Sequence, residues 1–360
     1  EVVKEVKTLY GNLISVQGVY VKRAFTRKAN LKLTYKNDYM IVPLSQLHKP
    51  IKTTMIPDKF IRDKMNKLYY YQWKPVDTNQ TNMELISEKK MGPYLLRKFK
   101  LYDELGFYMP ILNLKKIEGI ENYKGKVIAI HGRSGSPDLI LGLNKVDYSR
   151  ALGRAWADAG YDVFAPLVQN GKGLDFRILG FSSHGYDLFQ LNNLLNYIHS
   201  TSDQKIILTG ISYGAMLAEA LTILDEKDKI FTTISIQSRF AMNDWMHSQS
   251  FSKNYKLSKL KGRGEKNFGM FSDYFTAFYN GYLIYYLIHP KKLIISLSSE
   301  PIKKHKFFNP KEKNEYFIKI LNMYSNSNNI NNFKLNYFIG EHEADPLNEI
   351  DLFEEFFSSN

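Results

Sequence analysis

The chain has 360 residues, of which 44% are hydrophobic, and its formal net charge is +13. This length and apolar content are enough for a large core, in one α/β domain with an appendage or in two domains. The sequence has no cysteine, which excludes disulfide bonds, thiolate metal sites and a cysteine nucleophile. No apolar run approaches the roughly 18 residues of a membrane-spanning helix.

The positive charge by itself would favour anionic partners such as nucleic acid. However, the lysines are spread along the chain, although they are locally dense at 256–266 and 303–306. The sequence has neither zinc-finger spacing nor an RNP-type motif. We therefore expect a solvated basic surface and no nucleic-acid partner; the alternative, nucleic-acid binding, would show strongly salt-dependent affinity.

Residues 1–80 are interpreted as an N-terminal extension that is partly helical. Apolar side chains recur at helical spacing in Asp58–Gln72, with Asp58 as a candidate N-cap and Pro75 after the end. The chain starts at Glu1, and either a removed export signal or trimming would explain the missing methionine. We favour export, with a cytoplasmic location as the alternative.

Three strands are expected after this extension, at Met83–Lys89, Tyr94–Tyr102 and Phe107–Leu114. Gly92-Pro93 and Gly106 separate them. The alternation of side chains in the second strand is typical of an antiparallel sheet edge with one face in water. The N-terminal part of the sheet is therefore predicted to be antiparallel.

After Lys126 the pattern changes to strands that alternate with helices, which implies a mostly parallel sheet covered by helices on both faces. In such a sheet, ligands bind outside the carboxyl ends of the strands. Residues 239–286 interrupt the pattern and are interpreted as a cap-like insertion, helical at Asp273–Leu287. The expected strands are Val127–Ile130, Tyr161–Pro166, Ile206–Leu208, Ile230–Ile236, Leu293–Leu297 and Phe333–Ile339, and the expected helices are Val146–Ala159, Asp187–Ile198 and Leu347–Phe357.

The sequence Gly210-Ile211-Ser212-Tyr213-Gly214 fits the pattern G-x-S-x-G between a buried strand and a helix. A serine on such a sharp strand-to-helix turn is exposed above the sheet, and it needs small neighbours so that the backbone can bend. This context favours Ser212 as a catalytic nucleophile. The alternative is an ordinary tight turn in which the two glycines only allow a helix to pack closely on the sheet.

A nucleophilic serine needs a histidine base and a carboxylate that orients it, in the chain order Ser, Asp/Glu, His for this kind of sheet. His342 follows the last strand and a glycine turn, so it is expected at the same sheet edge as Ser212, whereas His289 precedes a strand and His305 lies in a lysine-rich loop. Glu300 is the favoured acid because it follows a strand end. Asp345 and Glu341 are the alternative acids, although Asp345 before Pro346 also resembles a helix N-cap.

The tetrahedral intermediate of acyl transfer needs two N–H donors. We expect one from the backbone amide of Tyr213 and the other from the backbone of Gly132 or Arg133, in the loop after the first parallel strand. His131 in the same loop is interpreted as structural.

With these residues in place, the chain resembles an α/β-hydrolase of the dienelactone hydrolase and acetyl xylan esterase-like branch over residues 81–360. That resemblance implies one catalytic domain, an α/β-hydrolase fold, and serine ester hydrolysis through an acyl-enzyme with no metal or organic cofactor. Glu300 occupies a position where this branch usually has aspartate, and residues 1–80 have no recognised counterpart. The motifs that carry the resemblance are 131–135 (HGRSG), 147–150 (DYSR), 159–163 (AGYDV), 210–214 (GISYG) and 340–343 (GEHE).

The predicted function is therefore a serine esterase or deacylase that acts on a small-molecule or acylated carbohydrate ester. Two alternatives remain: a serine peptidase of the same fold, and a catalytically inactive relative that binds a ligand or partner. The peptidases usually carry a large propeller domain before the hydrolase, and about 80 residues are too few for one. The oligomeric state is not indicated by the sequence.

Overall fold

The computed structural model describes residues 82–103, 106–133, 135–168, 183–202, 204, 206–225, 227–238, 281–298, 318 and 320–358, together with two short strands near the N-terminus. These two strands, β1 (Thr34–Lys36) and β2 (Tyr39–Ile41), pair antiparallel. The helix expected at Asp58–Gln72 and most of the insertion expected at 239–286 lie outside the described residues.

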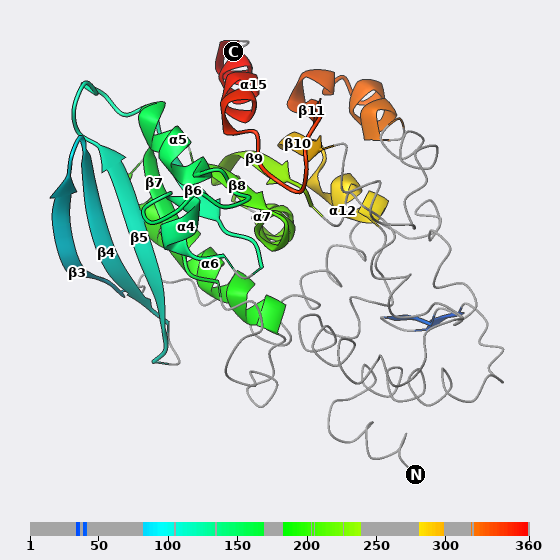
Figure 1. The fold of residues 1–360 in the computed structure, drawn as a ribbon. Coiled ribbons are helices and arrows are strands. Elements are labelled where there is room, and N and C mark those ends of the chain that lie inside the picture. The colour runs from blue at the N-terminus through cyan, green and yellow to red at the C-terminus, as the bar shows by residue number, and fades with distance from the viewer. Residues whose placement is uncertain are drawn as a thin grey trace, which may run out of the picture.

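A nine-stranded sheet with the order β11-β10-β9-β8-β6-β7-β5-β4-β3 forms the centre of the described structure (Figure 1). β6 to β11 run parallel to one another, and β3, β4 and β5 continue the sheet as antiparallel strands. This confirms the mixed sheet that the sequence predicts. The strands are β3 (Asn82–Met91), β4 (Tyr94–Tyr102), β5 (Tyr108–Lys116), β6 (Lys126–Ile130), β7 (Asp162–Pro166), β8 (Ile206–Ile211), β9 (Ile230–Ile236), β10 (Lys292–Ser298) and β11 (Phe333–Phe338).

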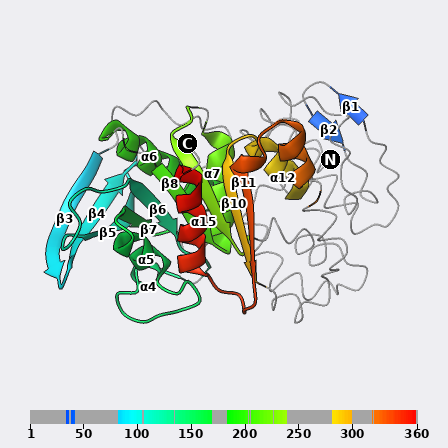
Figure 2. The same ribbon diagram turned by 90° about the horizontal axis from the view of Figure 1, so that it is seen from above.

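Helices cover the parallel strands on both faces (Figure 2). On one face lie α4 (Pro137–Ile140), α5 (Leu152–Asp158) and α15 (Pro346–Ser358), with α5 in contact with both of the others. On the other face lie α6 (Ser183–Ser200), α7 (Tyr213–Leu224) and α12 (Gly281–Ile288), with α7 in contact with both of its neighbours.

The two faces correspond to two separate hydrophobic cores, and the strand sequence decides which side chain joins which core. In β6, Ile128 and Ile130 belong to the core under α6, α7 and α12, whereas Val127 and Ala129 belong to the core under α4, α5 and α15. Because side chains alternate between the faces of a strand, a strand buried on both sides needs apolar side chains on both faces. This is why β6 and the first half of β8 read as continuous apolar runs in the sequence.

The helix expected at Val146–Ala159 is wrong in its first half, because α5 begins only at Leu152. The preceding residues form a turn in which the Asp147 carboxylate accepts hydrogen bonds from the backbone N–H and the hydroxyl of Ser149 (2.9 and 2.5 Å). Arg150 and Ala151 then have positive φ angles of 49° and 54°. A side chain that bonds to the local backbone competes with helix formation, and left-handed residues end it.

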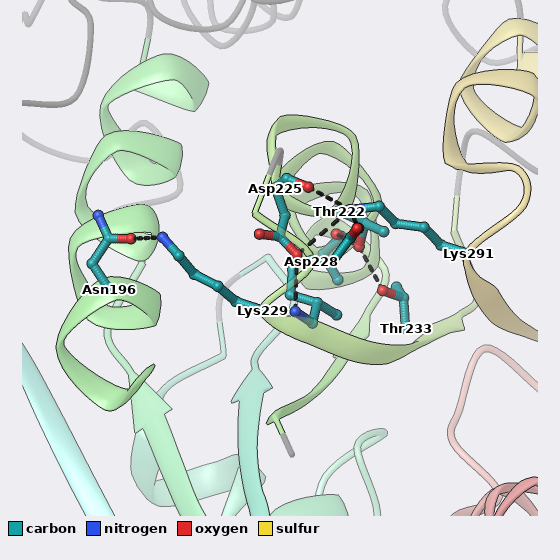
Figure 3. A network of polar contacts seen from close by, with 9 residues as sticks. Asn196, Thr222, Asp225, Asp228, Lys229, Thr233 and Lys291 are labelled. Atoms are coloured by element: carbon teal, nitrogen blue, oxygen red, sulfur yellow. Dashed lines mark hydrogen bonds and ion pairs between the residues drawn. The ribbon is translucent and has the colours of Figure 1, made fainter. Parts of the chain in front are cut away.

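The amino edge of the parallel strands carries a network of charged and polar side chains (Figure 3). Asp225, which follows α7, is 4% exposed; its carboxylate accepts from the Ile230 N–H (2.8 Å) and forms an ion pair with Lys291 (3.5 Å). Lys291 also pairs with Asp228 at 3.1 Å and donates to the Asp225 carbonyl. The same view shows Thr222 hydrogen-bonded to Thr233, and Lys229 reaching Asn196 on α6. This edge is opposite to the one at which the Ser212 turn emerges.

Helix α12 occupies the end of the expected insertion, Gly281–Ile288, in agreement with the helix predicted across Asp273–Leu287 where the two overlap. Within the described residues, no helix has both the length and the apolar content needed to cross a membrane.

Candidate active site

Ser212 lies on a sharp turn between the carboxyl end of β8 and the first residue of α7. Its backbone has φ 57° and ψ −109°, a conformation that costs free energy for any residue with a side chain. The turn is held by the Ser212 N–H, which donates to the carbonyl of Ile236 at the end of β9 (2.8 Å). Ser212 itself is 6% exposed. The strained backbone that the motif predicts for a nucleophile is therefore present.

Gly210 and Gly214 are required by backbone contacts on either side of this turn. A Cβ atom on Gly210 would lie 2.3 Å from the Gly214 carbonyl oxygen, and one on Gly214 would lie 2.1 Å from the Ile130 carbonyl oxygen. Neither neighbour is a side chain that could move aside. The turn consequently brings the start of α7 directly against the carboxyl ends of β8 and β6.

Tyr213 is the first residue of α7. Its phenol donates to the carboxylate of Asp187 on α6 (2.7 Å), and both side chains are buried. Burial, followed by the nearby Asp187, raises the pKa of the Tyr213 phenol well above its usual value. The phenol therefore remains a hydrogen-bond donor and fixes the first turn of α7 to α6.

The loop after β6 is tied to the protein through the carbonyl of Gly132. This oxygen accepts from the Gly135 N–H (3.0 Å) and lies 2.8 Å from His131 Nδ1. His131 Nε2 accepts from the Val168 N–H (3.2 Å), so the imidazole carries its proton on Nδ1 and donates to Gly132. The buried His131 thus links two loops, which agrees with its interpretation as structural.

The loop that carries His342 runs from the end of β11 back across the neighbouring strands. Ser298 Oγ at the end of β10 donates to the Glu341 carbonyl, and Gln237 Nε2, just after β9, donates to the Glu343 carbonyl (3.1 Å). Ala344 N–H then donates to the Tyr148 carbonyl (3.0 Å). His342 is therefore carried over the carboxyl edge of the sheet, toward the strand that ends in Ser212.

Two contacts beside His342 come from the turn that precedes α5. The Tyr148 and His342 rings have centroids 5.9 Å apart with planes tilted by 31°. Arg150 binds both carboxylate oxygens of Glu343, at 2.5 Å from Nη2 to Oε1 and 3.1 Å from Nε to Oε2. A bidentate pair of this kind fixes orientation as well as distance.

Of the three candidate acids, the structure describes Asp345 and Glu341. Glu300 follows β10 but lies outside the described residues. Asp345 directly precedes α15, and its N–H donates to the Glu349 carboxylate (3.1 Å), which matches the helix-start geometry that Asp345-Pro346 indicates. Glu341 is exposed, and its carbonyl accepts from Ser298.

Of the other two late histidines, the structure describes only His289, and it lies away from this edge. His289 follows α12 at the amino end of β10, where its Nε2 pairs with Ser327 Oγ (2.6 Å). This confirms that His289 lies at the wrong end of its strand, while His305 lies outside the described residues. In the described part of the chain, no cluster of His, Asp or Glu could hold a metal ion.

Two glutamates on the helices that cover the sheet, Glu219 and Glu349, are fully buried. Glu219 on α7 is fully buried and accepts from the hydroxyls of Ser235, Ser238 and Tyr285 (2.6, 2.7 and 2.6 Å). Burial raises the pKa of Glu219 to about 7, although the three hydroxyls oppose the rise. Glu349 on α15 accepts from Ser296 (2.7 Å), and burial raises its pKa to about 7 as well.

Comparison with known proteins finds relatives only through the structure. No family model matches the sequence, and no curated protein matches it. Solved structures of similar shape include a glucuronoyl esterase from Solibacter usitatus, with 11% identity and a TM-score of 0.58 over 85% of this chain and 93% of that one. The chain has the α/β-hydrolase fold.

Two further solved structures of this fold have similarly low identity. Methylesterase BT1017 has 12% identity and a TM-score of 0.56 over 88% of this chain, and the match spans 66% of the methylesterase. An acetyl xylan esterase from Paenibacillus sp. R4 has 12% identity and a TM-score of 0.50 over 88% of this chain and 99% of that one. The fold thus agrees with the one that the resemblance in the sequence implies.

Several residues of this α/β-hydrolase edge are not identified by sequence reasoning: Gln237, Asp187, Glu219, Tyr148 and Arg150. Gln237 has φ 54° and is 1% exposed, but nothing in the sequence distinguishes it from an ordinary residue after a strand. Tyr148 and Arg150 belong to the segment 147–150 that carries part of the resemblance, which was their only signal. Their contacts with the His342 loop, to Ala344 and Glu343, join residues almost 200 positions apart.

Proposed function

We propose that this protein is a serine carboxylester hydrolase that acts through an acyl-enzyme, with Ser212 as nucleophile, His342 as base and Glu300 as the orienting acid. The observation that carries the proposal is the strained turn at Ser212, placed at the sheet edge over which the His342 loop returns. The esterase names of the similar structures support the reaction class, while the identity is too low to transfer their substrates.

In the proposed reaction Ser212 Oγ attacks the ester carbonyl carbon while His342 accepts the hydroxyl proton. The tetrahedral intermediate collapses, and His342 returns the proton to the departing alcohol oxygen. Water then attacks the acyl-enzyme with His342 again as base, which releases the acid and restores Ser212. Glu300 orients the imidazole and stabilises its protonated form.

The intermediate's oxyanion is proposed to accept from the N–H groups of Tyr213 and Arg133. The Gly132 carbonyl is already bound by Gly135 and His131. Because a trans peptide places its N–H opposite its C=O, the Arg133 N–H points away from those partners. This argument favours Arg133 over the Gly132 amide, which the sequence left open as the second donor.

Glu300 remains the proposed acid because its strand, β10, is held to the histidine loop by the Ser298–Glu341 hydrogen bond. Asp345 is the alternative, and its backbone bond to Glu349 supports a structural role at the start of α15. We expect Glu300→Ala to lower kcat at least about a hundredfold and Asp345→Ala to lower it less than fivefold. The reverse result would transfer the acid role to Asp345.

The proposed substrates are carbohydrate esters or small-molecule acyl esters. Structures of the same fold are named as acetyl xylan, glucuronoyl and methyl esterases, which motivates a panel of acetylated and uronate-ester carbohydrates beside aryl esters of increasing acyl length. The member with the highest kcat/KM would define the substrate class.

The central test is labelling by a fluorophosphonate probe, which reacts with an activated serine. We expect the wild-type protein to be labelled and to hydrolyse short aryl esters, and Ser212→Ala to lose both, with kcat lower by about a thousandfold or more. Ser200→Ala, at the exposed end of α6, is the matched control and should keep both. A folded wild-type protein that is neither labelled nor active would refute the esterase and favour an inactive, ligand-binding relative.

A further inference from the structure

Tyr148 touches both parts of the proposed catalytic apparatus from a single position. It lies in the turn before α5, half-buried, between the loop after β6 and the loop that carries His342. Its phenol contacts the first loop, while its ring and its backbone carbonyl contact the second.

The phenol fixes the peptide that follows Arg133. Tyr148 Oη donates to the Arg133 carbonyl (3.2 Å) and packs on Gly132, whose Cα leaves room for it: a Cβ there would lie 2.3 Å from the phenol oxygen. The carbonyl on the other side of the Arg133 N–H, that of Gly132, is bound by His131 and Gly135. The carbonyl groups on both sides of the Arg133 Cα are therefore held in place, one of them by Tyr148.

The other side of Tyr148 supports the histidine loop. Its carbonyl accepts from the Ala344 N–H (3.0 Å), two residues after His342, and its ring lies beside the imidazole at 5.9 Å. Arg150, two residues along the same turn, binds Glu343 with both guanidinium contacts. Burial raises the pKa of Tyr148 to about 12, so the phenol stays a donor throughout the neutral range.

We propose that Tyr148 is a positioning residue that holds the Arg133 N–H and the His342 imidazole in register with Ser212. The inference rests on the proposed esterase function, since it assigns the amide and the imidazole their roles in that reaction. It follows from the hydrogen bond to the Arg133 carbonyl, the ring contact with His342 and the close packing on Gly132.

The test compares Tyr148→Phe with Tyr148→Leu by steady-state kinetics. Phenylalanine removes only the bond to Arg133, and a misplaced oxyanion donor weakens binding of the transition state more than of the ester. We expect kcat to fall about five- to tenfold with KM within twofold. Leucine also removes the ring, so kcat should fall further, by about thirtyfold or more, and the NMR signals of the His342 imidazole should shift in this variant only.

Tyr123→Phe is the matched control, because the Tyr123 phenol donates to the Lys116 carbonyl (2.6 Å) away from the site. It should leave kcat and KM unchanged. Wild-type-like kcat in Tyr148→Phe, or a change confined to KM, would overturn the inference while Ser212-dependent hydrolysis remains. Loss of the esterase itself would be recognised separately, by a wild-type protein without Ser212-dependent turnover.

Discussion

At the carboxyl edge of the parallel strands, tightly packed backbone shapes the Ser212 turn, whereas at the amino edge charged side chains connect the helices and strands. Gly210 and Gly214 lie so close to carbonyl groups that no Cβ fits, and Ser212 is strained. At the amino edge, Asp225 and Lys291 pair with each other and with nearby backbone groups (Figure 3).

The two edges of the sheet therefore differ in what their contacts do. Backbone contacts cannot be relieved by a change of rotamer, so they hold N–H groups in fixed directions, as catalysis by preorganised donors requires. Ion pairs and capping bonds close the ends of helices and strands, and their loss lowers stability without moving a reactive group. Substitutions at the two edges should therefore separate activity from stability.

The largest effect is expected for Gly214→Ala at the carboxyl edge. The added Cβ would lie 2.1 Å from the Ile130 carbonyl oxygen and 2.7 Å from that of His131, so the turn at Ser212 must open. We expect loss of fluorophosphonate labelling and a free energy of unfolding lower by about 3 kcal/mol, measured by denaturant titration. Gly92→Ala is the control: a Cβ there meets nothing within 4 Å, and only its φ of 56° costs about 1 kcal/mol with labelling retained. Equal labelling of the two variants would contradict the proposal that the turn at Ser212 positions the nucleophile.

The next effect concerns Glu219, a buried carboxylate near the carboxyl edge that accepts hydrogen bonds from three hydroxyls. Burial raises the pKa of Glu219 from 4.5 to about 7, so between these pH values the native state holds a proton that the unfolded state has released. The protonated Glu219 therefore stabilises the folded protein fully below pH 4.5, and this contribution to the free energy of unfolding is lost as the pH rises to about 7. Above that pH, Glu219 causes no further change. Relative to Glu219→Gln, which cannot ionise, the wild type should lose about 3 kcal/mol across this window.

The measurement is denaturant unfolding of both proteins at several pH values. A Glu219→Gln difference that does not change with pH would show that this carboxylate is ionised in the native protein at pH 4.5 to 7.

The smallest effect is expected at the amino edge. Asp225→Asn keeps an acceptor for the Ile230 N–H but removes the charge that Lys291 faces at 3.5 Å. We expect the free energy of unfolding to fall by about 2 kcal/mol, with kcat within twofold of wild type. A large loss of kcat in a stably folded variant would show that the two edges are coupled and would break the comparison.

Much of the fold could be predicted because the sequence pattern follows directly from burial. Strands covered on both faces are rich in apolar residues on both faces, which identifies β6, β8, β9 and β10, and the glycines of 210–214 indicate a tight turn. The helix at 146–159 was predicted too long, because the Asp147 side-chain bonds and the positive φ of Arg150 and Ala151 leave no periodic signal.

The sequence by itself determined the order of strands and helices along the chain and the tight turn at Ser212, because these depend on local pattern and on chain order. Only the tertiary structure decided that Gly132 makes room for the Tyr148 phenol, that Gln237 holds the histidine loop, and that Glu219 is buried among hydroxyls. The physical reason is range: periodicity records which face of an element is buried, whereas a hydrogen bond between loops depends on where the whole sheet places their ends.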